Sequence, residues 1–374
     1  MNTRLIRFVL PAVLAIVLAA AACGGGTTKG ASTNALIEGS WQFTGGTFLP
    51  GHAAEIGTLT YLDVTRSGDA TLYARTPFTG ILGCAGFLVA VVNESTLTAQ
   101  IPPLVSEGNS GTFFFTWVRN GSELTLTDSD GNSARFQKVD AVPAAAQCGA
   151  VTTTTLTFSL PPDTGGGIGS DGTKLYWTDS TDTQWVTFDP ATLSTSAIAI
   201  PITAQYGLIR AVQGPKDFWN DCRCGANEVI QRMGTSGTAV DTIDTSAPPI
   251  NMEIIIEAGT FHASHLWLAG DFYNGSVRLG PKLLKIDSEA EPDTLTASFD
   301  PDVPLQGIAF AGTRLFAVAP FLGYDLVELD PSIGTAIATW KLPAGHYYGA
   351  LAVVGNTLWI EKLDDGSLLF LDVP

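Results

Sequence analysis

The chain has 374 residues, of which 36 are acidic and 19 basic, giving a formal net charge of −17. So few lysines and arginines argue against nucleic acid or an anionic lipid surface as a partner. Strand-forming residues, 40 glycines and many Asp-Gly, Asn-Gly and Asp-Pro pairs predict an all-β fold. The length exceeds that of one typical domain, so we expect two domains.

The first 23 residues have the pattern of a secretory signal peptide. Two arginines precede an apolar run over 8–22, and a glycine-rich stretch follows Cys23. The run is too short to span a bilayer comfortably, and its flanks are those of a cleaved signal. Ala21-Ala22-Cys23 resembles the lipobox of bacterial lipoproteins, which implies that Cys23 is lipidated. Ordinary secretion, with Cys23 as a spectator, is the alternative.

Residues 24–35 are rich in Gly, Thr and Ser and are predicted to form a flexible tether. Because cleavage removes two arginines, the mature chain carries about −19. Gly24, rather than an aspartate, follows the cysteine, which favours the outer membrane if the cell has two. We therefore expect an exported, lipid-anchored protein of the bacterial cell envelope that contacts the membrane through its anchor alone.

Four cysteines remain after Cys23, and an even number in an exported protein suggests disulfides. Of the three possible pairings, we favour Cys84 with Cys148 and Cys222 with Cys224. The Cys-Arg-Cys triplet also has metal-binding character, but no His or Cys pair lies at zinc spacing nearby. We expect no metal and no cofactor.

Residues 36–148 are predicted to form an eight-stranded up-and-down barrel or a closely related sandwich. The Gly39-x-Trp41 start and the 124–131 segment, closed by Phe136, resemble bacterial lipocalin-like domains, which implies that Trp41 plugs the closed end of the barrel. Phe113, Phe115 and Trp117 alternate with Phe114 and Thr116, so one face fills a solid core or lines a ligand cavity. The expected strands are 40–44, 57–65, 69–75, 86–92, 96–101, 111–118, 122–127 and 133–139.

Residues 151–374 repeat one phrase five times: a turn, then an aliphatic residue and an aromatic one, as in 172–177. The anchor residues lie 43 to 49 residues apart, and such a period of short strands is typical of propeller blades. The phrases resemble the YVTN and NHL class of repeats, and the count is similar to that of glutamine-cyclotransferase-like propellers, which implies five blades. The anchors are Leu175, Phe218, Leu266, Leu315 and Leu358.

The number of expected outer strands is one short of the number of blades. The segment 155–161 matches the outer strand at 336–343 in sequence. We therefore predict that this first segment pairs with the last blade and closes the ring. Runs such as 368–371 lack alternation, because neighbouring blades cover both faces of a blade strand.

A ligand site is expected at one mouth of the central channel, where the segments that lead into the inner strands converge. Tyrosine, glutamate, glutamine and histidine side chains there would form a polar, aromatic-walled pocket, with His346 as its polar anchor. The alternative is that the same side chains plug the channel. The predicted ligand-binding residues are Tyr206, Glu257, Gln306, His346, Tyr347 and Tyr348.

No Gly-x-Ser-x-Gly, His-Glu-x-x-His or phosphate-loop motif occurs, so no catalytic residue is assigned. The main hypothesis is a membrane-anchored envelope lipoprotein whose propeller is a binding module for a small molecule, a glycan or an envelope protein. The alternative is a propeller enzyme, lyase or cyclotransferase-like, acting on a small or peptidic substrate. Fold analogy alone supports that alternative.

Overall fold

The computed structural model is nearly all strand, as predicted, with two short 3-10 helices, η1 (Thr33–Leu36) and η2 (Ala144–Ala146). Helix η1 takes in the last residues of the predicted tether. The signal segment, Cys23, Tyr206 and Cys224 lie outside the described residues. None of the helices in the described part is long and apolar enough to cross a membrane. The described ranges are 33–46, 60–76, 79–100, 112–156, 167–178, 184–199, 208–210, 217–222, 229–234, 239–244, 253–274, 277–290, 293–320, 324–343 and 346–374.

The first eight strands form a closed barrel in which each strand pairs with the next and β1 pairs antiparallel with β8. The predicted eight-stranded barrel is therefore confirmed, although β4 begins earlier than expected, at Leu82. The strands are β1 (Gly39–Gly46), β2 (Tyr61–Val64), β3 (Asp69–Arg75), β4 (Leu82–Val91), β5 (Thr96–Gln100), β6 (Thr112–Asn120), β7 (Glu123–Thr127) and β8 (Ser133–Val139).

Period-two alternation determines which side chains fill the barrel. Phe115 and Trp117 are buried, whereas Phe114 between them is 67% exposed. Trp41 is completely buried in the same core, and its indole Nε1 donates a hydrogen bond to the Ile37 carbonyl at 2.9 Å. The cations of two basic side chains lie 5.5 Å from the centre of the Trp41 ring, so polar groups cover this aromatic side chain.

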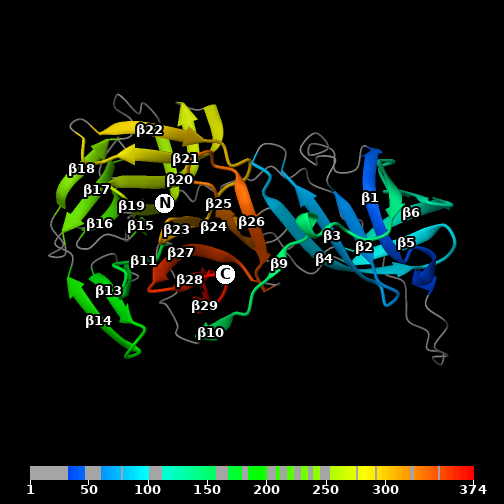
Figure 1. Ribbon diagram of the computed structural model, residues 1–374, viewed down its shortest axis with the longest axis horizontal. Helices are drawn as coiled ribbons and strands as arrows, with labels where there is room; N and C mark the ends of the chain where they lie inside the picture. The colour runs from blue at the N-terminus through cyan, green and yellow to red at the C-terminus, as the bar shows by residue number, and fades with distance from the viewer. Residues whose placement is uncertain are drawn as a thin grey trace, which may run out of the picture. The chain divides into compact units, whose positions relative to one another are not determined.

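The remaining strands form five sheets, which follow one another in chain order in Figure 1 and which we name the ring. Three sheets are simple four-stranded meanders. The first consists of β11 (Gly169–Ser170), β12 (Leu175–Thr178), β13 (Gln184–Asp189) and β14 (Ser194–Ala199). The second consists of β15 (Leu208–Arg210), β16 (Asp217–Cys222), β17 (Val229–Gly234) and β18 (Ala239–Asp244). The third consists of β19 (Glu253–His262), β20 (His265–Asn274), β21 (Val277–Asp287) and β22 (Thr294–Phe299).

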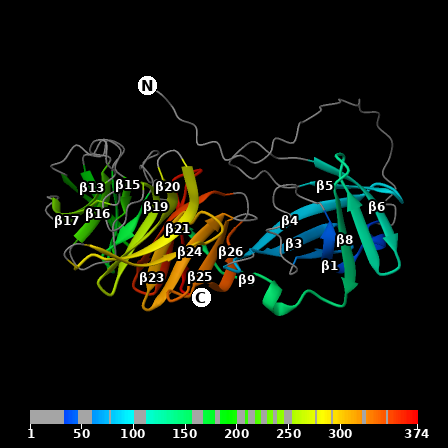
Figure 2. The ribbon, with the colours of Figure 1, turned by 90° about the horizontal axis from the view of Figure 1, so that it is seen from above.

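The next sheet has five strands, because β9 (Gly149–Ala150) pairs in parallel with β26 at its edge. Figures 1 and 2 both draw β9 beside β26. Only four sheets therefore have the regular four-stranded form of a blade, which differs from the five blades predicted. The five-stranded sheet consists of β23 (Gly307–Ala311), β24 (Arg314–Pro320), β25 (Tyr324–Leu329), β26 (Ala336–Lys341) and β9.

The first strand of the ring completes its last sheet. Strand β10 (Thr154–Leu156) pairs antiparallel with β29 (Leu368–Asp372), which pairs in turn with β28 (Thr357–Lys362) and β27 (Tyr348–Val354). The predicted closure is confirmed for residues 154–156. Leu368 and Leu369 are both buried, as expected for a strand covered on two faces.

The innermost strands of neighbouring sheets contact one another: β11 contacts β27, β27 contacts β23, β23 contacts β19 and β19 contacts β15. The five sheets are thus arranged as in a β-propeller, with the inner strands around one axis.

A disulfide joins Cys84 in β4 to Cys148, just ahead of β9, which confirms the first of the two predicted pairings. The barrel and the ring belong to one compact unit, Thr33–Pro374. Because Gly149 and Ala150 follow the disulfide directly, the bond fixes the start of the strand that pairs with β26.

Candidate functional site

The axis of the ring is closely packed. A cavity of about 10 Å³ lies there between β11, β19, β23 and β27, lined mostly by glycine, alanine and aliphatic residues. A Cβ atom on Gly307 would lie 2.6 Å from the Gly349 carbonyl oxygen, so β23 and β27 approach closely only because this residue is glycine. A space of this size holds about one water molecule. A larger ligand does not fit into this cavity.

The mouth, as we name it, is the end of the ring where the inner strands begin. Gly259 of β19 and Ile308 of β23 line the axial cavity. Glu257 lies two residues before Gly259 on β19, and Gln306 lies two residues before Ile308, just ahead of β23. Glu257 sits at a β-bulge, where the pairing with β20 shifts between Ile256 and Ala258. Such bulges redirect a side chain out of the regular alternation. The Glu257 side chain is half-buried.

Three tyrosine rings pack together beside Glu257. The ring of Tyr324, at the start of β25, meets the rings of Tyr347 and Tyr348 edge-on at centroid distances of 5.8 Å and 5.9 Å. Burial, followed by the electrostatic influence of Tyr347 and then of Glu257, raises the pKa of Tyr324 to about 12. Its hydroxyl therefore stays protonated at neutral pH. Glu257 and Tyr347, two of the predicted residues from different sheets, thus both raise the pKa of the Tyr324 hydroxyl.

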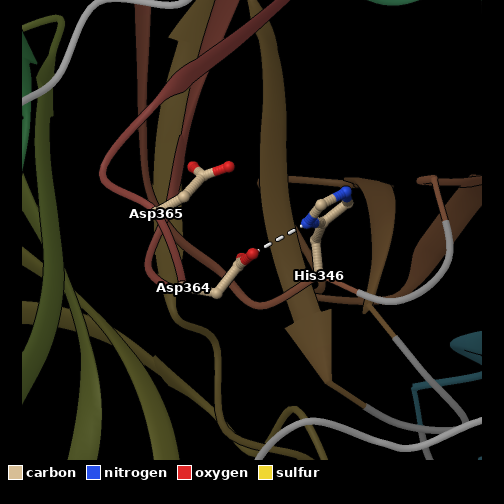
Figure 3. Close-up of side chains that lie close together, drawn as sticks. All are labelled: His346, Asp364 and Asp365. Carbon is tan, nitrogen blue, oxygen red and sulfur yellow. Dashed lines mark hydrogen bonds and ion pairs between the residues drawn. The ribbon is translucent and has the colours of Figure 1, made fainter.

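Next to this aromatic group, an aspartate orients a histidine (Figure 3). The Nδ1 atom of His346 lies 2.8 Å from the Oδ2 atom of Asp364, and the Tyr347 backbone N–H donates to the Oδ1 atom at 3.2 Å. Leu363 also donates its N–H to the Tyr347 carbonyl, at 3.0 Å. The turn between β28 and β29 thus fixes the backbone and ring of the His346–Tyr347 segment, with the imidazole about one-third exposed.

Asp365 completes a group of three potential metal ligands, since ligand atoms of His346, Asp364 and Asp365 lie within 4.8 Å of one another. The carboxylate of Asp365 is, however, already bonded. Lys362 Nζ lies 2.8 Å from one oxygen, and Ser367 donates its hydroxyl and its N–H to the other. Although partial burial opposes the effect, these bonds lower the pKa of Asp365 to about 2. They occupy lone pairs that a cation would need, so we assign no cation here.

The predicted residues have different environments in the structure. Gln306 is half-buried, and its backbone N–H donates to the Val318 carbonyl at 2.9 Å. Tyr348 is fully buried, and its hydroxyl donates to the Pro343 carbonyl at 3.0 Å. Tyr348 therefore supports the mouth from inside the core, whereas Glu257, His346 and Tyr347 are partly accessible.

Sequence reasoning missed Tyr324 and Asp364. Both lie at connections between the second and third strands of a sheet, β24–β25 and β28–β29. In a meander these connections lie at the same end as the start of the first strand, so they face the same mouth. The sequence signal for Tyr324 and Asp364 is therefore their position between the second and third strands of a repeat, whereas the predicted site residues all precede inner strands.

No protein-family model matches the chain, and no curated protein matches its sequence. Several solved structures resemble it at low identity. A catalytically inactive virginiamycin B lyase from Staphylococcus aureus with quinupristin has 14% identity and a TM-score of 0.34, over 89% of this chain and 99% of that one. A luciferin-regenerating enzyme has 12% identity and a TM-score of 0.37, over 60% of this chain and 95% of that one.

A nidogen/laminin complex has 13% identity and a TM-score of 0.36, over 70% of this chain and 90% of that one. These proteins include enzymes and a binding protein. At such low TM-scores the likenesses carry no argument about activity, and the propeller assignment rests on the sheets described above.

Proposed function

We propose that the protein is a binding module whose mouth takes a small molecule with a positively charged amine. The observation that carries this proposal is the meeting of Glu257, Tyr324 and Tyr347, from three different sheets, beside the His346–Asp364 pair. Tyrosine faces attract cations, and carboxylates give an ammonium its charge-assisted hydrogen bonds. The strongly negative chain also raises the local concentration of cations.

We further propose, from the sequence features alone, the setting in which this site works. The chain is exported to the bacterial cell envelope, preferentially the outer membrane, and is anchored through a lipid on Cys23. Its barrel, 36–148, is lipocalin-like, and its ring, 151–374, is a propeller in which the five-stranded sheet is the fifth blade. The Cys222–Cys224 pairing belongs to the same proposal.

A set of probes matched in size tests the ligand class. We expect benzyltrimethylammonium to bind, and benzyl alcohol and benzoate to bind at least tenfold more weakly, by isothermal titration calorimetry. Glu257→Gln should weaken benzyltrimethylammonium about tenfold, because the carboxylate charge is lost while the shape remains. Tyr347→Leu should have a similar effect through loss of the aromatic face.

Glu94→Gln is the matched control, because Glu94 is an exposed carboxylate in a hairpin of the barrel. It should leave all three affinities unchanged. Equal binding of the three probes, or equal binding of the cation by wild type and Glu257→Gln, would overturn the proposal.

The alternative function, an enzyme of lyase or cyclotransferase type, is favoured by one observation. A histidine held by a carboxylate at 2.8 Å is the arrangement of a general acid or base, because the carboxylate orients the ring and stabilises its protonated form. Incubation with small linear and cyclic peptides, followed by mass spectrometry, separates the two functions. An enzyme converts a peptide and loses the conversion on His346→Gln, whereas a binding module leaves every peptide intact.

A further inference from the structure

A larger hollow lies at the outer edge of the five-stranded sheet, beside the barrel. It is an open groove of about 440 Å³ between the outer face of β3, the segment around β9 and the end of β26. Thr71 and Tyr73 line one side, and Val151, Lys341, Leu342 and Pro343 line the other. The volume falls within the range of small-molecule sites. None of the residues predicted from the sequence to bind a ligand lies in this groove.

Covalent and backbone bonds hold the walls of the groove in place. The Cys84–Cys148 disulfide lines it, and Lys341 pairs with Ala150 across the parallel β9–β26 ladder. Trp340 packs so closely on Gly149 that a Cβ atom there would lie 2.4 Å from the indole ring. Because these elements are fixed before any ligand arrives, little conformational freedom is lost on binding.

The lining combines an apolar side with a few polar groups. Val151 and Pro343 supply aliphatic surface, and the Thr71 side chain shares a hydrogen bond with Tyr73. Lys341 contributes the positive charge. Among the described residues, no hydrogen bond or ion pair restrains the Lys341 ammonium, and the Lys341 side chain is only half-buried.

Two acidic groups act near this lining. Asp325 interacts electrostatically with Lys341, and Asp63 with Tyr73. Burial raises the pKa of Asp325 to about 7, so below that pH its carboxyl is mostly neutral and the charge of Lys341 is not compensated by it. A lysine with an uncompensated charge beside aliphatic surface suits a ligand that carries one negative charge and an apolar body.

We propose that this groove binds a small amphipathic anion, with a carboxylate paired to Lys341 and an aliphatic chain lying against Val151 and Pro343. The proposal is independent of the function proposed for the mouth. The outcome of the benzyltrimethylammonium, benzyl alcohol and benzoate titrations at the mouth therefore does not decide whether this groove binds an anion.

Titration calorimetry of the whole chain at pH 6 with octanoate, octanol and octylamine tests the charge preference. We expect octanoate to bind about tenfold more tightly than octylamine. Lys341→Met keeps an unbranched side chain but removes the charge, and should weaken octanoate about tenfold while changing octanol little. Lys174→Met, on another sheet, is the matched control and should change nothing.

A second variant tests whether the ligand binds in this groove, without changing the charge of the groove. Ala150 is exposed and lines the groove, so Ala150→Trp fills the groove without entering the core. It should weaken octanoate and octanol together. Tighter binding of octylamine than of octanoate, unchanged octanoate affinity in both variants, or no binding of octanoate at millimolar concentration would each overturn the proposal.

Discussion

Replacement of both Cys84 and Cys148 by serine is expected to lower the free energy of unfolding by about 4 kcal/mol. The two cysteines are 64 residues apart in sequence, and their bond closes a loop that contains most of the barrel strands. A cross-link over a loop of this length removes many conformations from the unfolded chain, and the cost of its loss grows with the logarithm of loop length. Urea unfolding followed by circular dichroism measures the change.

Dithiothreitol provides the internal control for this prediction. It should lower the stability of the wild-type protein to about that of the double-serine variant. It should change the variant little, because the proposed Cys222–Cys224 bond closes only a very short loop. Coincident unfolding curves for the wild type and the variant under oxidising conditions would show that the bond contributes no stability.

The repeat pattern predicted the ring because every blade uses the same local chemistry. A turn followed by an aliphatic anchor recurs after the inner strands of four of the sheets, and these anchors, Leu175, Leu266, Leu315 and Leu358, are all completely buried. The closing strand was also predictable, because the segment before the first blade repeats the sequence of an outer strand. Strand β10 lies where that comparison placed it.

The fifth strand of one sheet was not predictable, because its two residues carry no pattern. Gly149 and Ala150 show neither alternation nor β-branching, and their pairing with β26 is parallel. The strand forms because the disulfide holds Cys148, the residue just before it, and because the indole of Trp340 covers Gly149. Both causes are contacts between residues far apart in sequence, which local propensity does not report.

The candidate site was predicted in part for a similar reason. Glu257 and Tyr347, which both act on Tyr324, lie within or next to inner strands whose positions the repeat predicts. Tyr348, one residue further along, turns into the core and bonds the Pro343 carbonyl. Whether a residue at a strand entry faces the mouth or the core depends on irregularities such as the shift in pairing between Tyr348 and Leu351, which composition does not reveal.

The second large effect is expected from Asp325→Asn, which should stabilise the protein much more at pH 8 than at pH 5. Asp325 is only 1% exposed, and its Oδ2 atom has no hydrogen-bond partner among the described residues. Burial raises its pKa to about 7, against the opposing effects of Lys341, its cross-strand partner, and of the Cys84 backbone N–H. The ionised carboxylate is therefore poorly accommodated in the fold.

The sign of the pH dependence follows from proton binding. Between the ordinary aspartate pKa of 3.8 and about 7, the folded state holds a proton on Asp325 that the unfolded state has lost. The contribution of this group to stability is therefore fully present below pH 3.8 and falls as pH rises towards 7. The full loss is on the order of 4 kcal/mol, since each unit of pKa shift corresponds to about 1.4 kcal/mol.

Unfolding midpoints of the wild type and Asp325→Asn at pH 5, 6, 7 and 8 test this prediction. The amide cannot ionise, so the difference between the two proteins should widen from pH 5 to about pH 7 and then level off. Asp140→Asn, which changes an exposed aspartate, should keep a constant difference from the wild type. A constant difference for Asp325→Asn as well would mean that the carboxyl stays ionised, in which case Lys341 and the Cys84 N–H compensate its charge and burial does not determine its protonation.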